Sequence, residues 1–255
     1  MLNPIDSIYA KARRVGQLLG LPTVGIEEFA TTEFTEEEKN ASDLHRLFYG
    51  HQGPVVHKWK HYLSVYHRHL AQYRGTPVRL LEIGVFKGGS LHLWREYFGA
   101  EATIFGVDID PSCASLGGRA AQVRIGSQDD PDFLAAVVKE MGGVDVVIDD
   151  GSHVCPHQVA SFRYLFPQLA EPGVYICEDL HTNYWRGYHQ GGFRRASTFI
   201  ETSKEIVDDL NSCFHSDGSN LQSEFSILGI HFYNSMVVID KGTPEQPAHI
   251  QIGST

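Results

Sequence analysis

The stretch VRLLEIGVFKGGSLHLWREYFGAEATIFGVD, residues 78–108, decides the fold class of this 255-residue chain. An apolar run, a glycine-rich turn, a segment with helical spacing and a second apolar run together predict a parallel β-α-β unit. Three further apolar runs follow, separated by helical patterns: AQVRIGS (121–127), VDVVIDD (144–150) and GVYICED (173–179). These runs lack the regular alternation of half-buried strands, which is typical of strands covered on both faces. The sequence therefore predicts an α/β fold with a mostly parallel sheet between two layers of helices.

Both ends of the chain extend this unit. A helix is expected near 195–213, and EFSILGIHFYNSMVVID (224–240) reads as two strands that form an antiparallel pair and complete a seven-stranded sheet. Residues 1–75 are polar and helical in pattern, without a convincing strand. We expect them to form an N-terminal helical segment that acts as a lid or in oligomerisation, followed by a catalytic domain over 76–255.

Composition narrows the class of partner. The formal net charge of −10 argues against nucleic acid, because phosphate neutralisation needs basic patches. No apolar run approaches the roughly 18 residues of a membrane span, and the opening MLNPIDSIYAKARRV lacks the apolar core of a signal peptide. We expect a cytoplasmic protein that forms a homo-oligomer. Its four cysteines contain no CxxC pair, so a disulfide framework or thiolate zinc site is not expected.

The turn EIGVFKGGS (82–90) indicates the cofactor. In an open α/β sheet, ligands bind at the carboxyl ends of the strands, and the spacing G-x-x-x-G-G differs from the dinucleotide pattern G-x-G-x-x-G. Glu82 would repel a pyrophosphate but suits a cationic ligand, and Asp108 at the tip of the second strand can bind a ribose diol. A cationic cofactor with ribose and no phosphate fits, namely S-adenosylmethionine. The alternative is that Gly84–Gly89 is only a tight turn between strand and helix.

This pattern is typical of a Rossmann-like class I methyltransferase, and it predicts a set of cofactor contacts at the strand ends. Ser127 and Gln128, in the turn after the third strand, would lie at the adenine end. Asp149 is a further candidate, with capping of the next helix as its alternative role. The complete predicted set is Glu82, Gly84, Gly88, Ser90, Asp108, Ser127, Gln128 and Asp149.

Three carboxylates follow the fourth and fifth strands, which are neighbours in this architecture. Asp150 ends the fourth strand, and Glu178 and Asp179 end the fifth. Together they repel one another unless a cation lies between them or one is protonated, so we expect them to bind Mg²⁺ through oxygen ligands. His153 lies close enough to take a proton from a metal-activated hydroxyl as general base. The alternatives are capping roles for the carboxylates and a plain histidine at a helix start.

The motifs IDDGSH (148–153), SFRYLFPQL (161–169) and CEDLHTNYW (177–185) resemble the metal-dependent sugar O-methyltransferases of antibiotic biosynthesis. These include macrolide deoxysugar and enediyne rhamnosyl enzymes, and the similarity spans about residues 45–240. It implies an S-adenosylmethionine-dependent enzyme that methylates a sugar hydroxyl, with Asp150, Glu178 and Asp179 as Mg²⁺ ligands and His153 as base. The acceptor would be a small-molecule sugar, nucleotide-linked or carried by a natural product. Relatives often have T-D-K after the Tyr-Gly pair at 49–50, where this chain has HQG.

Weaker signals concern the acceptor. Tyr62 and Tyr66 are candidate stacking surfaces for a sugar, and His181 and Trp185 follow the carboxylate pair. Arg194 could meet the diphosphate of a nucleotide-linked acceptor, although a plain basic pair at a helix start is an alternative. The six histidines between 45 and 69 show no pair with clean metal spacing beside a third ligand, which favours a solvated helix face.

Two other functions remain open from the sequence. One is an oxidative or methoxylation-linked enzyme of the cephalosporin hydroxylase type. The other is a catalytically silent module that binds S-adenosylmethionine. The first would be supported by a two-histidine, one-carboxylate iron site, and no clear set is visible in the sequence. A catalytically silent module would not need the metal ligands or His153.

Overall fold

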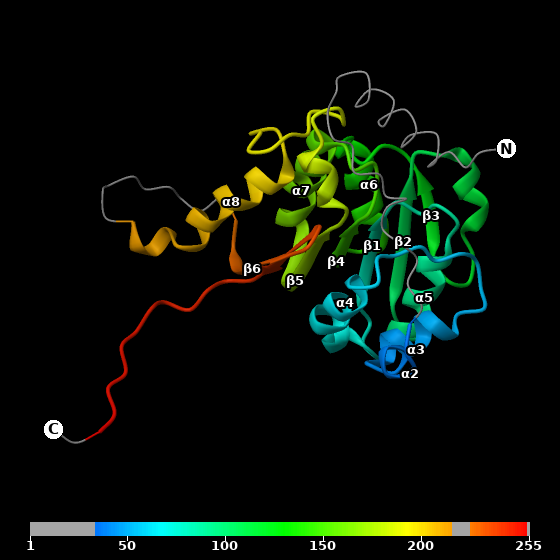
Figure 1. Cartoon of the computed structure of the whole chain (residues 1–255), viewed down its shortest axis with the longest axis horizontal. Coiled ribbons are helices and arrows are strands. Elements are labelled where there is room, and N and C mark those ends of the chain that lie inside the picture. The colour runs from blue at the N-terminus through cyan, green and yellow to red at the C-terminus, as the bar shows by residue number, and fades with distance from the viewer. Residues whose placement is uncertain (1–33, 216–224, 254–255) are drawn as a thin grey trace.

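Seven strands form one sheet in the order β3-β2-β1-β4-β5-β7-β6 in this computed structural model, which describes residues 34–215 and 225–253 (Figure 1). The strands are β1 (Arg79–Ile83), β2 (Thr103–Asp108), β3 (Gln122–Ile125), β4 (Val144–Asp149), β5 (Leu169–Cys177), β6 (Ile227–Tyr233) and β7 (Met236–Lys241). Pairing is parallel from β3 through β5, whereas β7 runs antiparallel to both β5 and β6. The predicted seven-stranded, mostly parallel sheet is confirmed.

The fifth strand differs from its predicted start. It begins at Leu169 rather than at Gly173, because Leu169 pairs with Val144 before the register shifts at the next pair. Pro172 lies in this irregular part, where a residue without an N–H donor does not interrupt the ladder. The sequence pattern showed only the regular portion of the strand.

Helices cover both faces of the sheet. They are α2 (Glu36–Lys39), α3 (Asp43–Gly50), α4 (Tyr62–Leu70), α5 (Gly89–Phe98), α6 (Pro131–Met141), α7 (Cys155–Gln168) and α8 (Phe199–Leu210). Short 3-10 turns lie at η2 (Ala71–Tyr73), η3 (Pro111–Leu116), η4 (Leu180–Tyr184) and η5 (Ser212–Phe214). Helices α3, α4 and α5 pack on one face, and α6, α7 and α8 pack on the other. Helix α6 is capped by Asp130, whose side chain accepts hydrogen bonds from the amides of Asp132 and Phe133.

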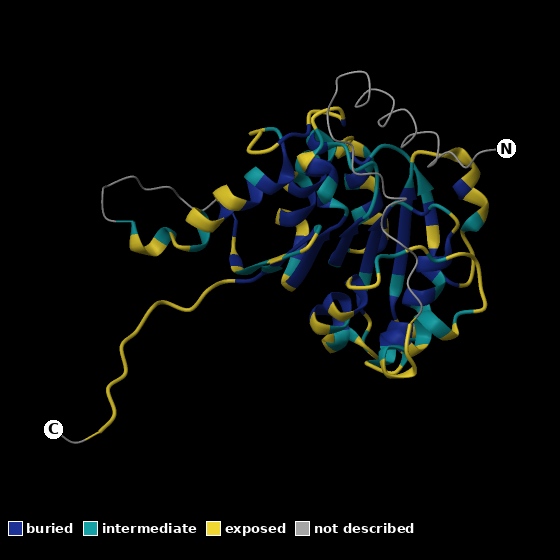
Figure 2. Cartoon of the chain, in the orientation of Figure 1, coloured by how far each residue is buried: buried dark blue, intermediate teal, exposed yellow. Residues whose placement is uncertain are grey.

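Two apolar cores result from this arrangement. Successive residues of one strand point to opposite faces, so Leu80 of β1 lies in the core beneath α4 and α5, and Leu81 lies in the core beneath α7. The central strands are buried along most of their length (Figure 2). Among the described residues, no helix has the length and apolar character that a membrane crossing requires. The division at residue 75 and the lid or oligomerisation role stay predictions, and residues 1–33 of that segment lie outside the described chain.

The order of the strands places the site. The chain moves outward from β1 to β2 and β3 and then returns to form β4 beside β1. The direction of winding therefore reverses between β1 and β4, and the crevice at their carboxyl ends is where open α/β sheets bind ligands. The amide of Asp150 donates to the carbonyl of Ile83 across this crevice at 2.9 Å.

Replacing Phe162 by alanine tests the core beneath α7. Its ring is fully buried and lies 5.0–5.4 Å, centroid to centroid, from the rings of Phe166, Tyr175, Phe199 and Phe225. We expect Phe162→Ala to lower the free energy of unfolding by about 3–5 kcal/mol, measured by urea denaturation. Leu228→Ala is the control, because Leu228 on β6 is half exposed. An equally small loss of unfolding free energy in both variants would contradict the packing of Phe162.

Candidate active site

The predicted carboxylates meet at the carboxyl ends of β1, β4 and β5, around one buried lysine. The Nζ atom of Lys58 lies 2.6 Å from Oδ2 of Asp150, 3.0 Å from Oε2 of Glu178 and 3.7 Å from Oε1 of Glu82. Its side chain is only 2% exposed. Because three carboxylates face one ammonium group, Lys58 is the shared counter-charge of the site.

Burial and charge set the protonation of this cluster. Burial alone lowers the pKa of Lys58, but Asp150, Glu178 and Glu82 outweigh it and raise that pKa well above its ordinary value. Burial, together with the charge of Asp150, raises the pKa of Glu178 well above its usual range, despite the opposing effects of Lys58 and the Tyr66 hydroxyl. The lysine therefore stays charged, while the protein without metal favours protonation of Glu178.

Asp179 is held from the other side by α4 and the residues before it. Its Oδ1 accepts hydrogen bonds from Nε1 of Trp59 and the hydroxyl of Tyr62, both at 3.0 Å. Its backbone is left-handed, with φ of 54°. Burial raises the pKa of Asp179, but His153, His181 and the Tyr62 hydroxyl more than compensate and hold it below its usual range. Asp179 is therefore an ionised carboxylate with a fixed orientation.

His153 faces the carboxylates through Nε2, which lies 3.6 Å from Oδ2 of Asp179 and 4.0 Å from Oδ1 of Asp150. Its Nδ1 is buried without a hydrogen-bond partner in the structure. His181 repeats this pattern, because its Nδ1 lies 2.6 Å from the hydroxyl of Ser235 while its Nε2 is buried and unpartnered. Unsatisfied buried imidazole nitrogens are costly unless a ligand completes them.

The donors present fit a hard divalent cation. Asp150, His153 and Asp179 each direct a ligand atom to a common point, with these atoms within 4.8 Å of one another. Nearby Glu82 and Glu178 share the single ammonium of Lys58, so negative charge remains in excess at the strand ends. Glu178 is bound by Lys58 and Tyr66 and stands outside the group of three. Its role as a third metal ligand stays a prediction.

The cofactor loop has the backbone that its glycines predict. Gly84 has φ of 93° and Gly88 has φ of 78°, both in the left-handed region. A Cβ atom on Gly84 would lie 2.1 Å from the carbonyl oxygen of Asp150, and one on Gly89 would lie 2.3 Å from the carbonyl oxygens of Pro54 and Val55. Only glycine permits these approaches, so the loop, the end of β4 and the chain before Lys58 are in direct contact.

Two predicted cofactor acids have partners within the protein. Glu82 is fully buried and accepts hydrogen bonds from the Ser90 hydroxyl at 2.8 Å and from Nε1 of Trp94 at 3.2 Å. Asp108 accepts from the backbone amides of Val85 at 2.8 Å and Phe86 at 3.2 Å. Both carboxylates thus shape the glycine loop, and direct contact of Glu82, Ser90, Asp108, Gly84 and Gly88 with a cofactor stays a prediction.

The structure places Asp149 and Gln128 in a hydrogen-bonded group inside the protein, and their contact with a cofactor stays a prediction. Asp149 is fully buried, and its Oδ2 accepts from the hydroxyls of Ser161 at 2.6 Å and Tyr175 at 3.0 Å, while Nε2 of Gln128 donates to Oδ1 at 3.0 Å. Asp149 and Asp150 are adjacent, and adjacent residues at a strand end point to opposite faces. The side chain of Asp149 therefore stabilises the α7 face, and Gln128 is its partner. The hydroxyl of Ser127 bonds to Asp129.

Two predicted acceptor residues lie behind the carboxylates. Tyr62 and Tyr66 are completely buried and donate their hydroxyls to Asp179 and Glu178, and their role as stacking surfaces for a sugar stays a prediction. Trp185 packs against His181, with ring centroids 5.0 Å apart, which leaves both as candidate acceptor contacts. Arg194 is exposed and lies over the ring of Phe193.

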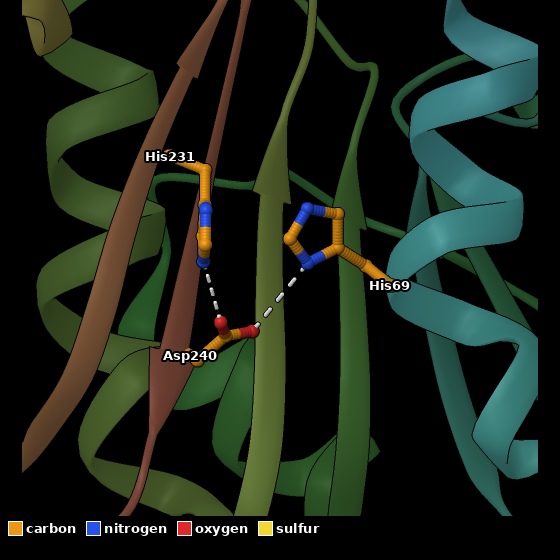
Figure 3. A group of neighbouring side chains, drawn as sticks. All are labelled: His69, His231 and Asp240. Atoms are coloured by element: carbon orange, nitrogen blue, oxygen red, sulfur yellow. Dashed lines mark hydrogen bonds and ion pairs between the residues drawn. The ribbon is translucent and has the colours of Figure 1, made fainter.

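Lys58 and Trp59 were missed in the sequence because Lys58 lies 92 residues from Asp150 and 120 from Glu178, and Trp59 lies 120 residues from Asp179. The signal was the excess of carboxylates, which requires a positive partner, next to the lysines of KWK (58–60). The sequence showed no clear set of two histidines and one carboxylate, but the structure brings His69, His231 and Asp240 together as such a group (Figure 3). They come from α4, β6 and β7, so their separation in sequence hid the set.

Lys58→Met tests the shared counter-charge. Removing one partner of a buried ion pair leaves uncompensated charge, so we expect the metal-free variant to lose about 3–5 kcal/mol of unfolding free energy. Lys60→Met is the matched control, because Lys60 pairs with Glu38 at the surface, where both side chains are about 40% exposed, and should cost at most about 1 kcal/mol. Urea denaturation in EDTA measures both, and equal losses would contradict the role of Lys58.

Glu178→Gln tests the raised pKa of Glu178. In the metal-free protein the folded state holds a proton that the unfolded chain releases, so wild-type stability should fall as pH rises from the unfolded pKa to the folded pKa. The glutamine variant lacks this proton and should therefore gain stability relative to wild type across that window. Urea denaturation over a pH series in EDTA measures the difference, with exposed Glu37→Gln as control. If the difference in unfolding free energy between Glu178→Gln and wild type did not change with pH, the raised pKa of Glu178 would be contradicted.

Comparisons with known proteins agree with this geometry. No family model matches the chain. The 8-demethyl-8-(2-methoxy-alpha-L-rhamnosyl)-tetracenomycin-C 3'-O-methyltransferase of Streptomyces olivaceus is 39% identical over 212 residues, which cover 78% of this chain and 54% of the relative. The L-olivosyl-oleandolide 3-O-methyltransferase of Streptomyces antibioticus is 36% identical over 182 residues, which cover 67% of this chain and 47% of the relative.

The solved structure of the MycE methyltransferase from the mycinamycin biosynthetic pathway, in complex with Mg, SAH and mycinamycin VI, has a TM-score of 0.71 at 31% identity. The match covers 79% of this chain and 54% of that structure's chain. The present chain thus spans about half the length of the curated relatives it matches. These similarities identify it as a homologue of the sugar O-methyltransferases of macrolide and tetracenomycin biosynthesis, with their class I methyltransferase fold.

Proposed function

We propose that this chain is an S-adenosylmethionine-dependent, divalent-metal-dependent O-methyltransferase that acts on a sugar hydroxyl of a glycosylated natural product. The observation that carries the proposal is the meeting of Asp150, His153 and Asp179 at the β1–β4 crevice, directly beside the glycine loop. A binding module would not need this combination of buried carboxylates and an unsatisfied imidazole. The MycE structure, which holds Mg and SAH, supports the same pairing of metal and cofactor here.

The metal ligands would be Asp150 and Asp179, with Glu178 as the third carboxylate. When bound, Mg²⁺ would lower the pKa of an acceptor hydroxyl and orient it. The protein prepares this site through hydrogen bonds that orient the carboxylates. Trp59 and Tyr62 donate hydrogen bonds to Asp179, and Tyr66 donates one to Glu178. Helix α4 and Trp59 before it therefore fix the orientation of these two carboxylates.

His153 would take the proton of the acceptor hydroxyl at Nε2. The imidazolium that forms is stabilised by Asp179 at 3.6 Å and Asp150 at 4.0 Å. When bound, S-adenosylmethionine would supply the methyl group that the hydroxyl oxygen receives as it loses its proton. The cofactor carries the activated methyl, so the protein contributes positioning and proton transfer.

The acceptor class follows from the relatives. Their names describe methylation of rhamnosyl-tetracenomycin and olivosyl-oleandolide, and a small glycosylated molecule agrees with the net charge of −10 of this chain. His181 and Trp185, adjacent to the carboxylate pair, would contact the sugar, and Arg194 a more distal part of the acceptor. Cytoplasmic location and homo-oligomerisation remain proposals that rest on the sequence.

Titration calorimetry with S-adenosylmethionine and S-adenosylhomocysteine, with and without Mg²⁺, is the first test. We expect both ligands to bind. Transfer of a labelled methyl group to rhamnosylated or olivosylated acceptors then distinguishes an enzyme from a silent module, since the module would bind cofactor without turnover. Failure to bind either ligand would contradict the proposal.

Two substitutions separate the roles of metal ligand and base. Asp150→Asn should lose Mg²⁺ binding and methyl transfer together. His153→Ala should retain S-adenosylhomocysteine and Mg²⁺ binding but lower kcat by about 10²–10⁴-fold, the usual contribution of a general base. His249→Ala, in the exposed C-terminal segment, is the matched control. An unchanged kcat in His153→Ala would refute the base assignment.

A further inference from the structure

A second group of metal-ligating side chains lies away from the strand-end carboxylates, where α4 contacts the edge of the sheet. His69 is in the last turn of α4, His231 is on β6 and Asp240 is on β7, and the three side chains point toward one another (Figure 3). Nε2 of His231 lies 2.8 Å from Oδ2 of Asp240, and Nδ1 of His69 lies 3.7 Å from Oδ1. Their ligand atoms are all within 4.8 Å of one another.

This spacing is close to that of a bound transition metal. Zinc–nitrogen and zinc–oxygen bonds of about 2.0–2.2 Å place the ligand atoms of a tetrahedral site about 3.3–3.6 Å apart. The 2.8 Å contact of His231 with Oδ2 is a hydrogen bond shorter than that value, which a bound cation would replace, and the 3.7 Å contact of His69 with Oδ1 is slightly longer. The 3.7 Å separation between His69 and Asp240 is also too long for a hydrogen bond, so Nδ1 of His69 faces the carboxylate without one.

The surroundings of His69 have the features of a metal-binding histidine. Its second nitrogen, Nε2, lies 2.9 Å from the hydroxyl of Tyr233 on β6, and a partner of this kind orients the ring and leaves the other nitrogen free to ligate. His69 is 7% exposed, whereas the side chains of His231 and Asp240 are 40% and 29% exposed. The outer side of the group is therefore open to solvent, which provides an entry path and a fourth ligand.

The charge of the group favours a cation. Asp240 supplies one carboxylate, and His69 and His231 supply two imidazole rings. An ionised carboxylate with two imidazoles matches the preference of borderline divalent metals such as Zn²⁺ over Mg²⁺, which prefers oxygen ligands alone.

We propose that His69, His231 and Asp240 bind a transition-metal cation of the Zn²⁺ class, with solvent completing its coordination. The site joins α4 to the two strands at the β6 edge of the sheet. Tyr62, Tyr66 and His69 stand at positions i, i+4 and i+7, which is one face of α4. The cation therefore fixes the helix whose two tyrosines hold Asp179 and Glu178.

Zinc titration of the full chain in an Asp150→Asn background tests the proposal, because this substitution disables the other candidate metal group. Calorimetry with ZnCl₂ should show one zinc equivalent, together with a zinc-dependent rise in Tm. Adding His231→Gln or Asp240→Asn should weaken zinc binding by more than about 100-fold. That exceeds the loss of about 10–100-fold that is typical when a residue hydrogen-bonded to a ligand is replaced. Tyr233→Phe, which removes the partner of His69, should weaken binding by about 10–100-fold.

His249→Gln in the same background is the matched control, since His249 lies in the exposed C-terminal segment, and it should bind zinc unchanged. His231 and Asp240 are partly exposed, so their variants are expected to fold, and circular dichroism checks this. The proposal is overturned if the Asp150→Asn protein binds no zinc, or if His231→Gln and Asp240→Asn bind it as tightly as the control. Zinc binding is the readout, so the result does not depend on the proposed methyl transfer.

Discussion

The ion pairs of Lys58 with the strand-end carboxylates are the constraint on which the rest of the site depends. Parallel strands bring their carboxyl ends to one edge, and this chain places an acid there on β1, β4 and β5. Such a group cannot remain buried without positive charge. Lys58 supplies it from a segment outside the sheet, with its ammonium within 3.7 Å of Glu82, Asp150 and Glu178. The helical layer in front of the sheet is therefore part of the candidate active site.

That layer gives the carboxylates direction as well as charge. Tyr62 and Tyr66 are large aromatic residues that fill the core beneath α4, and their hydroxyls reach Asp179 and Glu178. One side chain thus contributes apolar burial at its ring and a hydrogen bond at its tip. The last turn of the same helix carries His69, beside β6 and β7. The packing of α4 consequently affects both the stability of the fold and the geometry of the site.

The sequence predicted the features that local pattern determines. Apolar runs located the five parallel strands, and the position of Asp150 and Asp179 directly after two of them located the carboxylate group. It could not show that β7 inserts between β5 and β6, because strand order beyond a hairpin leaves no local signal. Nor could it show that Asp149 bonds to Ser161 and Tyr175 while Asp150 faces Lys58, because one residue of alternation moves a side chain to the other face of the sheet. The hydroxyl of Tyr62 reaches Asp179, and an aromatic residue on a helix has the same sequence pattern whether it faces solvent or a carboxylate.

The contact of Gly89 with the carbonyl oxygens of Pro54 and Val55 has a thermodynamic consequence. These two residues lie against the start of α5, where the glycine loop ends, and three residues after Val55 the same segment places Lys58 at the carboxylates. A ligand at the loop that displaced this segment would also displace Lys58. Binding at the loop and binding at the carboxylate group would then be linked equilibria, and because such linkage is reciprocal, each ligand would change the affinity for the other by the same factor.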